Sequence, residues 1–383
     1  MIPLAVPNLE GREREYLNKC IDTTFVSSVG EFVNRIEEMT AQECGAKYGV
    51  ATSSGTTGLH LSLIGCGVGY GDIVIIPSFT FIATANAVAH CGAVPWLMDI
   101  DRSWTMNIDQ LENELDRNAA LVDGKCIHKL SGRRVAAIMP VYTLGNIPDM
   151  TRLNAVAKKY NLPVIADAAA AIGATRDGRA LADLAMLSVI SFNGNKTVTA
   201  GGGGMVVGND EALLKKLKHL STTARVTAEY DHDMVGYNYR MTNIQAAVGC
   251  AQLERLDSFI ERKRAVRHFY NDRLKDIEGI SFFPPEPVDG STCWFSGFVL
   301  DKGNLNVVRE ICKELKAQGI EGRSFWKPVH LQKPYEHALK ADSLEFANNI
   351  WERIITLPCS THITDAELDQ VVSTVRQILP KYL

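Results

Sequence analysis

The chain has 383 residues, of which 46% are hydrophobic and 22% are charged, and its formal net charge is −4 at pH 7. This length allows one or two domains with a large core, and the composition is typical of a soluble globular protein. The slightly negative charge excludes the basic surface of a nucleic-acid-binding protein. No apolar run reaches membrane-spanning length and residues 1–17 lack the features of a signal peptide, so we expect a cytoplasmic protein with no membrane partner.

Nine cysteines are scattered singly between Cys20 and Cys359, without a Cys-x-x-Cys pair or a cluster with histidine. This spacing is typical of reduced thiols in a cytosolic protein, most of them buried as small hydrophobic side chains. We therefore expect no metal site.

Short apolar runs alternate with helix-like segments between residues 47 and 208. In chain order the expected elements are strand 48–54, helix 55–67, strand 72–78, helix 81–92, strand 94–100, strand 135–143, helix 150–160 and strand 162–167. The alternation predicts the α/β class, with a mostly parallel and buried central sheet flanked by helices.

The pattern changes after residue 236. Residues 241–274 predict a long, mostly helical stretch, and Thr242 and Gln245 have the spacing of a capping box at its start. A helix of this length commonly bridges two domains. We therefore expect an N-terminal arm and large domain over residues 1–245, followed by the bridging helix and a smaller α+β domain over residues 246–383.

The segment "SSGTTGLH", residues 53–60, joins an expected strand to an expected helix. Its small residues let backbone amides approach an anion, and a helix N-terminus carries partial positive charge. The hydroxyls of Ser54, Thr56 and Thr57 could add hydrogen-bond donors. A simple helix cap with a flexible turn is the alternative interpretation.

Asp167 ends an apolar strand in the segment "IADAAAAIGA". Ligands of open α/β sheets gather at the carboxyl ends of the strands, where this carboxylate should lie. It could equally cap the helix that follows, and the residues alone leave both interpretations open.

Lys196 stands alone in the loop of "SFNGNKTVTAGGGGM". The loop is not a phosphate-binding P-loop, because no glycine directly precedes the lysine. Ser191 upstream and the glycines 201–204 downstream would let a cofactor approach the backbone. In an enclosed site the amine would have a lowered pKa and could attack carbonyl groups; a solvated surface charge is the alternative.

The segment "GYNYRMTN", residues 236–243, is by default a structural junction beneath the long helix. Together with "SSGTTGLH", "FTFIATANAV", "VIADAAAAIGA" and the lysine loop, however, it occurs in the order seen in one family. The chain resembles the sugar aminotransferases of the DegT/DnrJ/EryC1/StrS family over almost its whole length. The resemblance implies the fold-type-I architecture of pyridoxal-phosphate enzymes.

The resemblance also implies roles for individual residues. Lys196 matches the lysine that binds pyridoxal 5′-phosphate covalently and later moves the proton. Asp167 matches the carboxylate that faces the pyridine nitrogen and keeps it protonated. Phe81 matches the aromatic residue that stacks on the cofactor ring. Residues of the phosphate cradle are matched by Gly55, Thr56 and Ser191, with Asn238 lent by the neighbouring subunit, so a homodimer is implied.

Three positions depart from the family pattern. Ala166 stands where an acid usually precedes the aspartate, and Ala170 stands where Gln, Glu or His usually lies near the cofactor ring. Tyr142 replaces a usual histidine. The change at Ala170 removes a polar partner near the 3′-oxygen of the cofactor, which could alter the tuning of the ring or make room for substrate.

The resemblance implies a two-step reaction, in which the cofactor takes an amino group from glutamate and passes it to a keto group of a nucleotide-linked deoxysugar. The segments "VSSVGEFVNRIEE", "STTAR" and "GYNYRMTNIQAA" are most similar to the branch that aminates C4 of UDP-linked 4-keto-6-deoxy-N-acetylhexosamines. GDP-perosamine synthesis and a dTDP-sugar are the nearest alternatives. A non-catalytic paralogue that binds pyridoxal phosphate is the hypothesis from a different class.

A sugar diphosphate needs cationic contacts, for which Arg225, Lys327 and His330 are candidates. The segment 323–330, "RSFWKPVH", resembles the part of the small domain that faces the active site. For each of the three side chains, a surface or junction role is the alternative.

Overall fold

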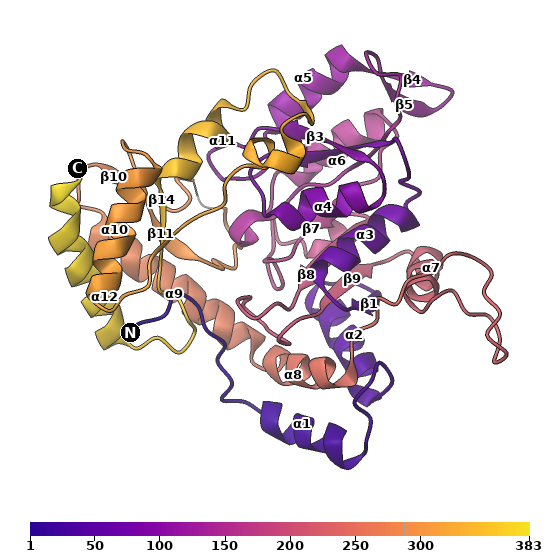
Figure 1. The fold of residues 1–383 in the computed structure, drawn as a ribbon, viewed down its shortest axis with the longest axis horizontal. Helices are drawn as coiled ribbons and strands as arrows, with labels where there is room; N and C mark the ends of the chain where they lie inside the picture. The colour runs from indigo at the N-terminus through magenta and orange to yellow at the C-terminus, as the bar shows by residue number, and fades with distance from the viewer. Residues whose placement is uncertain (287) are drawn as a thin grey trace.

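The computed structural model describes residues 1–286 and 288–383, and Figure 1 shows the order of its helices and strands. The helices are α1 Glu13–Asp22, α2 Glu31–Glu43, α3 Gly55–Gly65, α4 Ile82–His90, α5 Ile108–Asn118, α6 Met150–Lys159, α7 Glu211–Ser221, α8 Asn243–Leu253, α9 Leu256–Leu274, α10 Leu305–Ala317, α11 Glu345–Ile350 and α12 Asp365–Ile378. The strands are β1 Tyr48–Thr52, β2 Ile73–Pro77, β3 Val94–Met98, β4 Ala119–Val122, β5 Lys125–His128, β6 Val135–Ile138, β7 Ile165–Asp167, β8 Leu187–Ser191, β9 Gly204–Gly208, β10 Ile280–Ser281, β11 Ser296–Leu300, β12 Arg323–Ser324, β13 Leu339–Lys340 and β14 Ile354–Leu357.

Two groups of four strands form the centre of the molecule. One group has the order β13-β3-β2-β6 and the other the order β7-β8-β9-β1. Parallel bridges from Ile138 to Val164 and from Val141 to Asp167 connect the groups where β6 meets β7. The carboxyl ends of β6 and β7 therefore open at the same edge.

The expected mostly parallel sheet is confirmed, with one difference. Strand β9 runs antiparallel to both of its neighbours, β8 and β1. No helix separates β8 from β9 along the chain, so β9 returns directly beside β8, whereas parallel neighbours need a long crossover connection.

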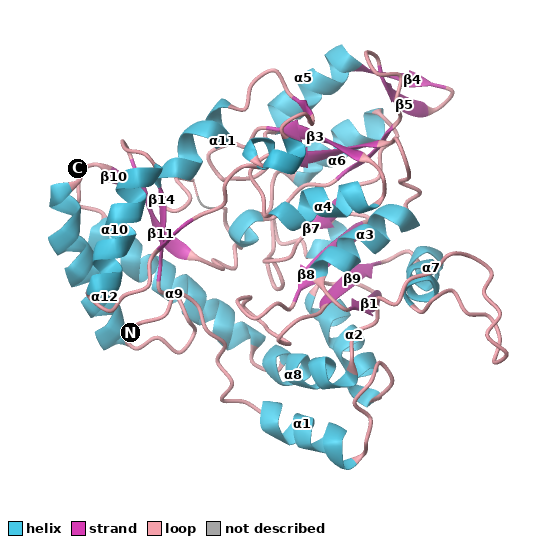
Figure 2. Ribbon diagram, in the orientation of Figure 1, coloured by secondary structure: helices cyan, strands magenta, loops and turns pink. Residues whose placement is uncertain are grey.

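The central strands are buried because helices cover both faces of the sheet, as Figure 2 shows. All five residues of β2, all four of β6 and all five of β9 are buried. Runs of Val and Ile without alternation suit strands that are covered on both sides.

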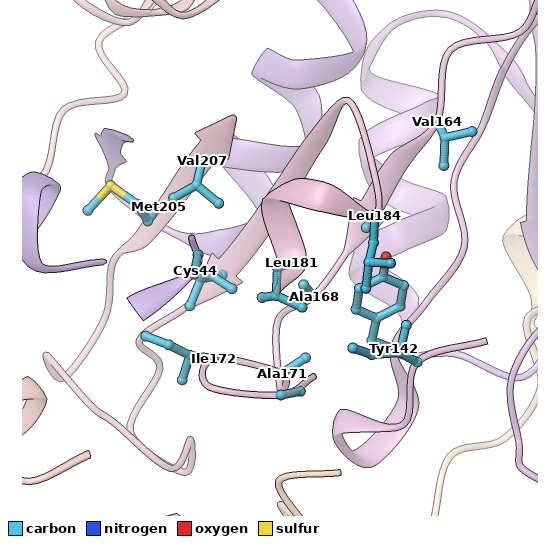
Figure 3. Close-up of a cluster of buried hydrophobic side chains, with 14 of the residues drawn as sticks. Cys44, Tyr142, Val164, Ala168, Ala171, Ile172, Leu181, Leu184, Met205 and Val207 are labelled. Atoms are coloured by element: carbon cyan, nitrogen blue, oxygen red, sulfur yellow. The ribbon is translucent and has the colours of Figure 1, made fainter. Parts of the chain in front are cut away.

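Figure 3 shows part of the core beside β9. Labelled side chains come from the end of α2, from β9, from the chain after β6 and from the chain just before and after β7: Cys44, Tyr142, Val164, Ala168, Ala171, Ile172, Leu181, Leu184, Met205 and Val207. Small alanines next to β7 let these larger side chains pack close to the strand that carries Asp167. Ala166 is also fully buried, so an acid at that position would need a buried partner.

A second, antiparallel sheet lies toward the C-terminus, in the order β10-β11-β14-β12. Helices α9, α10 and α12 pack around it, on the side where Figure 1 places both chain ends. Ile2 and Leu4 from the N-terminus belong to the same hydrophobic cluster, while β13 reaches back to pair with β3. The domain division at residues 245 and 246 stays a prediction.

The expected long helix is divided into α8 and α9, with Glu254 and Arg255 between them. Glu254 accepts a hydrogen bond from Tyr16 of α1 (2.5 Å) and forms an ion pair with Arg35 of α2. The capping box at the start of α8 is confirmed, because the Thr242 and Gln245 side chains each accept a backbone N–H of the other residue.

Within residues 1–286 and 288–383, no helix combines the length and the apolar character needed to cross a membrane.

Candidate active site

A cavity of about 580 Å³ opens at the carboxyl ends of the central strands. It is bounded by the start of α3, the start of α4, the loop after β8 and two segments of the C-terminal part of the chain. The lining residues include Ser54, Gly55, Thr56, Thr80, Phe81, Tyr142, Asp167, Ala170, Ser191, Asn193, Lys196, Gly203, Trp294, Phe295, Arg323, Phe325 and Trp326.

The start of α3 forms one wall of the cavity. The Ser54 hydroxyl accepts the N–H of Thr57 (3.1 Å), and the Thr57 hydroxyl accepts the N–H of Ser54 (3.0 Å). This capping box leaves the backbone N–H groups of Gly55 and Thr56 outside the helical hydrogen-bond ladder. The wall therefore offers amide donors and the positive end of a helix to an anion.

The run of four glycines follows the lysine loop and packs against this helix start. A Cβ on Gly204 would lie 2.7 Å from backbone atoms of Ser54 and Gly55, closer than real contacts allow. Gly203 has a φ of +94°, in the left-handed region that favours glycine. Gly204 is therefore required by the close approach of two backbones, and Gly203 by its positive φ.

Asp167 lies at the end of β7 and is only 5% exposed. Its Oδ2 accepts a hydrogen bond from the Thr84 hydroxyl (2.7 Å), and its Oδ1 accepts the N–H of Ala169 (3.2 Å). Burial raises the pKa of Asp167, and the two hydrogen bonds and the charge of Lys196 act in the opposite direction. Of the two interpretations from the sequence, the structure favours the ligand site, because Asp167 lines the cavity and no regular helix follows it.

Lys196 projects from the loop between β8 and β9 into the same cavity. Burial lowers the pKa of its amine from 10.5 to about 8, although the nearby charge of Asp167 raises it. The Nζ atom lies 3.6 Å from the centroid of the Trp294 ring. The amine is thus enclosed and has a larger neutral fraction at pH 7 than a solvated lysine.

Aromatic side chains form the wall opposite α3. Phe81 precedes α4, is 57% exposed and lines the cavity. Its ring centroid lies 6.3 Å from that of Trp326, which stacks on Phe325 at 4.4 Å. A planar ring would find aromatic contacts here.

The structure brings together most of the residues expected at the site. Gly55, Thr56, Phe81, Asp167, Ser191 and Lys196 all line the cavity. Ala170 lines it too, so the departure at this position places a methyl group where a longer polar side chain is usual.

Four expected residues lie outside the cavity lining. Asn238 is exposed and pairs with Thr222 across an isolated bridge. Arg225 is exposed over the ring of Tyr230. Within the segment 323–330, the cavity is lined by residues 323–326.

The remaining two expected residues, Lys327 and His330, lie in that segment but outside the cavity lining. Lys327 is exposed and absent from the lining. His330 is buried, with Nδ1 hydrogen bonded to the Ser78 hydroxyl and Nε2 to Asn348 Oδ1 (2.7 Å). Both ring nitrogens of His330 already have protein partners, which indicates a junction role.

Sequence reasoning missed Thr84 and Trp294, and it named the segment 323–330 without singling out Phe325. The spacing of Thr84 from Asp167 carries no local signal, because the two are 83 residues apart. The aromatic density of "STCWFSGF" and "RSFW" was a possible signal for Trp294 and Phe325. Such clusters more often belong to a core, so they do not single out a site residue by themselves.

The fold and the cavity define an enzyme class in which a reactive amine lies beside a site for an anionic ligand. Comparison with known proteins makes this class specific: residues 7–376 match the DegT/DnrJ/EryC1/StrS aminotransferase family. The chain belongs to this family. The predicted enzyme class, sugar aminotransferase, and the predicted cofactor of the family, pyridoxal 5′-phosphate, are confirmed.

Individual relatives cover nearly the full chain. A GDP-perosamine synthase from Caulobacter vibrioides is 39% identical over 380 residues, which is 99% of this chain and 98% of the relative. A UDP-N-acetyl-3-dehydro-alpha-D-glucosamine 3-aminotransferase from Acidithiobacillus ferrooxidans is 32% identical, covering 94% and 91%. The crystal structure of a family aminotransferase from Brucella abortus aligns with a TM-score of 0.86 and 28% identity, covering 96% and 95%. The fold-type-I architecture is thereby confirmed.

The residues present fit this cofactor. An amine with a lowered pKa suits the aldehyde, the open amides at the start of α3 suit the phosphate, and the buried carboxylate of Asp167 suits the ring nitrogen.

Proposed function

We propose that the enzyme transfers an amino group from glutamate to C4 of UDP-2-acetamido-4-keto-2,6-dideoxyhexose, a nucleotide-linked keto sugar of bacterial glycan biosynthesis. The observation that carries the proposal is that Lys196 and Asp167 line one cavity beside the N-terminus of α3. An amine of this kind reacts with carbonyl groups and exchanges protons near neutral pH.

Lys196 is the proposed catalytic residue. It would hold the cofactor covalently and, once released, move the proton at the carbon that gains or loses the amino group. Pyridoxal 5′-phosphate supplies an electron-withdrawing ring next to that carbon. Because the pKa of Lys196 is about 8, the side chain can both take up and give back a proton near neutral pH.

Asp167 is assigned to the ring nitrogen of the cofactor. Burial raises the pKa of this carboxyl group, and a positively charged nitrogen beside it would lower the pKa again. Thr84 and the N–H of Ala169 fix the orientation of the carboxylate. The aspartate would thereby keep the ring nitrogen protonated.

The phosphate is assigned to the amides of Gly55 and Thr56 with the hydroxyl of Ser191. A Cβ on Gly55 would lie 3.0 Å from the Cβ of Ser191, so these two residues are adjacent across the cavity wall. The exposed ring of Phe81 is assigned to the face of the cofactor ring.

A homodimer with shared sites is part of the proposal. Asn238 lies on the chain between α7 and α8, which extends away from the body of the molecule in Figure 1. This segment exposes Val226, Tyr230 and Val235, which a second copy would cover. Asn238 would then be free to reach the partner's phosphate site.

The nucleotide is the least constrained part of the proposal. Residues 26–38, 221–225 and 236–247 resemble the branch that uses UDP-linked sugars, whereas a relative at 39% identity is a GDP-perosamine synthase. A GDP-linked substrate is therefore the second candidate. Arg225 and Lys327 lie outside the cavity lining, so they stay candidates for binding the diphosphate only if the substrate, or a site in the partner subunit, extends to them.

The test is an assay of the purified enzyme with glutamate and a panel of UDP-, GDP- and dTDP-linked 4-keto-6-deoxy sugars. We expect turnover with the UDP-linked sugar and loss of bound-cofactor colour when glutamate is added. Turnover of GDP-linked sugars alone overturns the nucleotide assignment. Colour that glutamate leaves unchanged supports the non-catalytic paralogue.

The covalent role of Lys196 needs a separate variant. Lys196→Ala should lower turnover by about 10³-fold or more. Lys215→Ala is the matched control, because Lys215 lies on the exposed face of α7 in an ion pair with Glu211. Equal activity in the two variants contradicts the proposed function.

A further inference from the structure

Trp294 contacts the amine of Lys196 from a distant part of the chain. It lies just before β11, is 3% exposed and lines the cavity. The Lys196 Nζ atom is 3.6 Å from the centroid of the indole ring. A cation this close to the face of an aromatic ring is attracted by the negative charge density there, and more strongly where water is excluded.

The indole is held in place from two sides. Its Nε1–H donates a hydrogen bond to the carbonyl of Asn195 (2.7 Å), the residue that precedes Lys196. The backbone carbonyl of Trp294 accepts a hydrogen bond from the Nζ of Lys263 (3.0 Å), which also donates to the backbone carbonyl of Cys359 (2.7 Å). Lys263 is 4% exposed. These contacts give Trp294 one position relative to the lysine loop.

Neighbouring rings further restrict the indole. The Phe295 ring centroid is 4.3 Å away and that of Trp326 is 6.1 Å away. Because the ring cannot turn freely, the face it presents to Lys196 is set by the packing of the C-terminal part of the chain. The contact is therefore between a flexible side chain and a rigid surface.

We propose that Trp294 is a positioning residue that holds the amine of Lys196 against its ring face whenever the amine is not bonded to the cofactor. This inference rests on the proposed function, in which Lys196 is released and bonded again in each cycle. Holding the amine at one place keeps it within reach of the cofactor and of the carbon whose proton it moves.

The contact also has an electrostatic consequence. The ring favours the ammonium form and so acts with Asp167, against burial, which lowers the pKa of Lys196 to about 8. Lys263 lines a small hollow together with Lys196, and Arg323 lines the cavity, while Asp167 is the charged group that raises the pKa of Lys196. Removing the ring should therefore lower the pKa of Lys196 further.

Trp294→Phe and Trp294→Leu separate the contribution of the ring face from that of the indole N–H. Phenylalanine keeps a smaller ring face and loses the N–H that binds the Asn195 carbonyl, whereas leucine loses both. Trp351→Phe is the matched control, since it makes the same exchange at a buried tryptophan of the C-terminal part of the chain that does not line the cavity. Thermal unfolding of each full-length variant shows whether its fold is retained.

The measurement is the rate at which the cofactor-free chain captures pyridoxal 5′-phosphate, followed by visible absorbance as a function of pH. The midpoint of the curve of rate against pH reports the pKa of the attacking amine. The rate on the plateau at high pH reports how well the neutral amine is positioned for attack. We expect the midpoint to fall by about one pH unit in Trp294→Leu and by less in Trp294→Phe, with lower plateaus in the same order. Trp351→Phe should keep the midpoint of the unaltered chain.

Two results overturn the inference. An unchanged midpoint in both Trp294 variants shows that the ring does not act on the amine. A raised midpoint shows that the ring only excludes water. If the Lys196→Ala enzyme still converts substrate, the proposed function itself fails. If that variant is inactive but the midpoints of the Trp294 variants are unchanged, only the inference about Trp294 fails. If Trp294→Leu does not fold, the shift in Trp294→Phe decides.

Discussion

Lys196 and Asp167 face one cavity from two different strand ends, and each opposes the effect of burial on the other. Burial lowers the pKa of the lysine and raises that of the aspartate, while their mutual attraction raises the first and lowers the second. The charge of each group therefore contributes to the protonation of the other. This mutual effect leads to the first two predictions.

The rate of cofactor capture by the cofactor-free chain should rise with pH through a midpoint of about 8. The pKa of Lys196 is lowered from 10.5 to about 8, so the neutral, nucleophilic amine dominates only above that pH and the ammonium below it. Absorbance after mixing with pyridoxal 5′-phosphate measures the rate. A midpoint near 10.5, as for a solvated lysine, contradicts the prediction.

Asp167→Asn should move that midpoint to lower pH. The carboxylate raises the pKa of Lys196, and the amide keeps a similar shape without the charge. Capture at pH 7 should become faster, whereas turnover should fall by about 10²-fold or more because the ring nitrogen loses its anion. Asp183→Asn serves as the control, because Asp183 is exposed at the end of a short 3-10 helix and does not line the cavity. A midpoint displaced upward contradicts the attraction between the two groups.

Gly203→Ala should destabilise the protein more than Gly67→Ala. Both glycines have positive φ, so each variant places alanine in the left-handed region, at a cost of about 1–2 kcal/mol. A Cβ on Gly203 would also lie 2.6 Å from the Cε of Met241, whereas a Cβ on Gly67 meets nothing within 4 Å. Overpacking adds about 1–3 kcal/mol. Denaturant unfolding measures both variants, and equal losses would mean that Met241 moves aside freely.

Tyr142→Phe should raise the free energy of unfolding by about 1 kcal/mol. The Tyr142 side chain is 1% exposed, and its hydroxyl has no hydrogen-bond partner among the described residues. Figure 3 shows its ring within the apolar cluster that includes Leu184. Removing a buried, unpaired hydroxyl removes its desolvation cost.

Tyr270→Phe is the matched control for Tyr142→Phe. Tyr270 is equally buried, but its hydroxyl donates a hydrogen bond to the carbonyl of Pro358 (2.7 Å). Its removal should cost about 1 kcal/mol, because the carbonyl loses its donor. Thermal or denaturant unfolding compares the two variants. A loss of stability in Tyr142→Phe would show that its hydroxyl has a partner in solution.

Local patterns in the sequence predicted the elements that build the cavity. The strand that ends at Asp167, the loop that carries Lys196 and the capping box at Thr242 were all expected from short stretches of residues. Each depends on contacts within a few residues, and such contacts can be predicted from the hydrophobic period and from the spacing of particular residue types. The reversed direction of β9 and the division of the long helix at Glu254 were not expected, because both depend on packing partners elsewhere in the chain.

The sequence alone determined the fold class, the family and the two ionisable residues at the centre of the cavity, since motifs in order carry that information. Only the tertiary structure decided what surrounds them. Trp294 reaches the lysine loop across a separation of 99 residues, and His330 turns inward to Ser78 and Asn348. Which side chains meet across such distances is set by how the two sheets pack, and no local pattern records it.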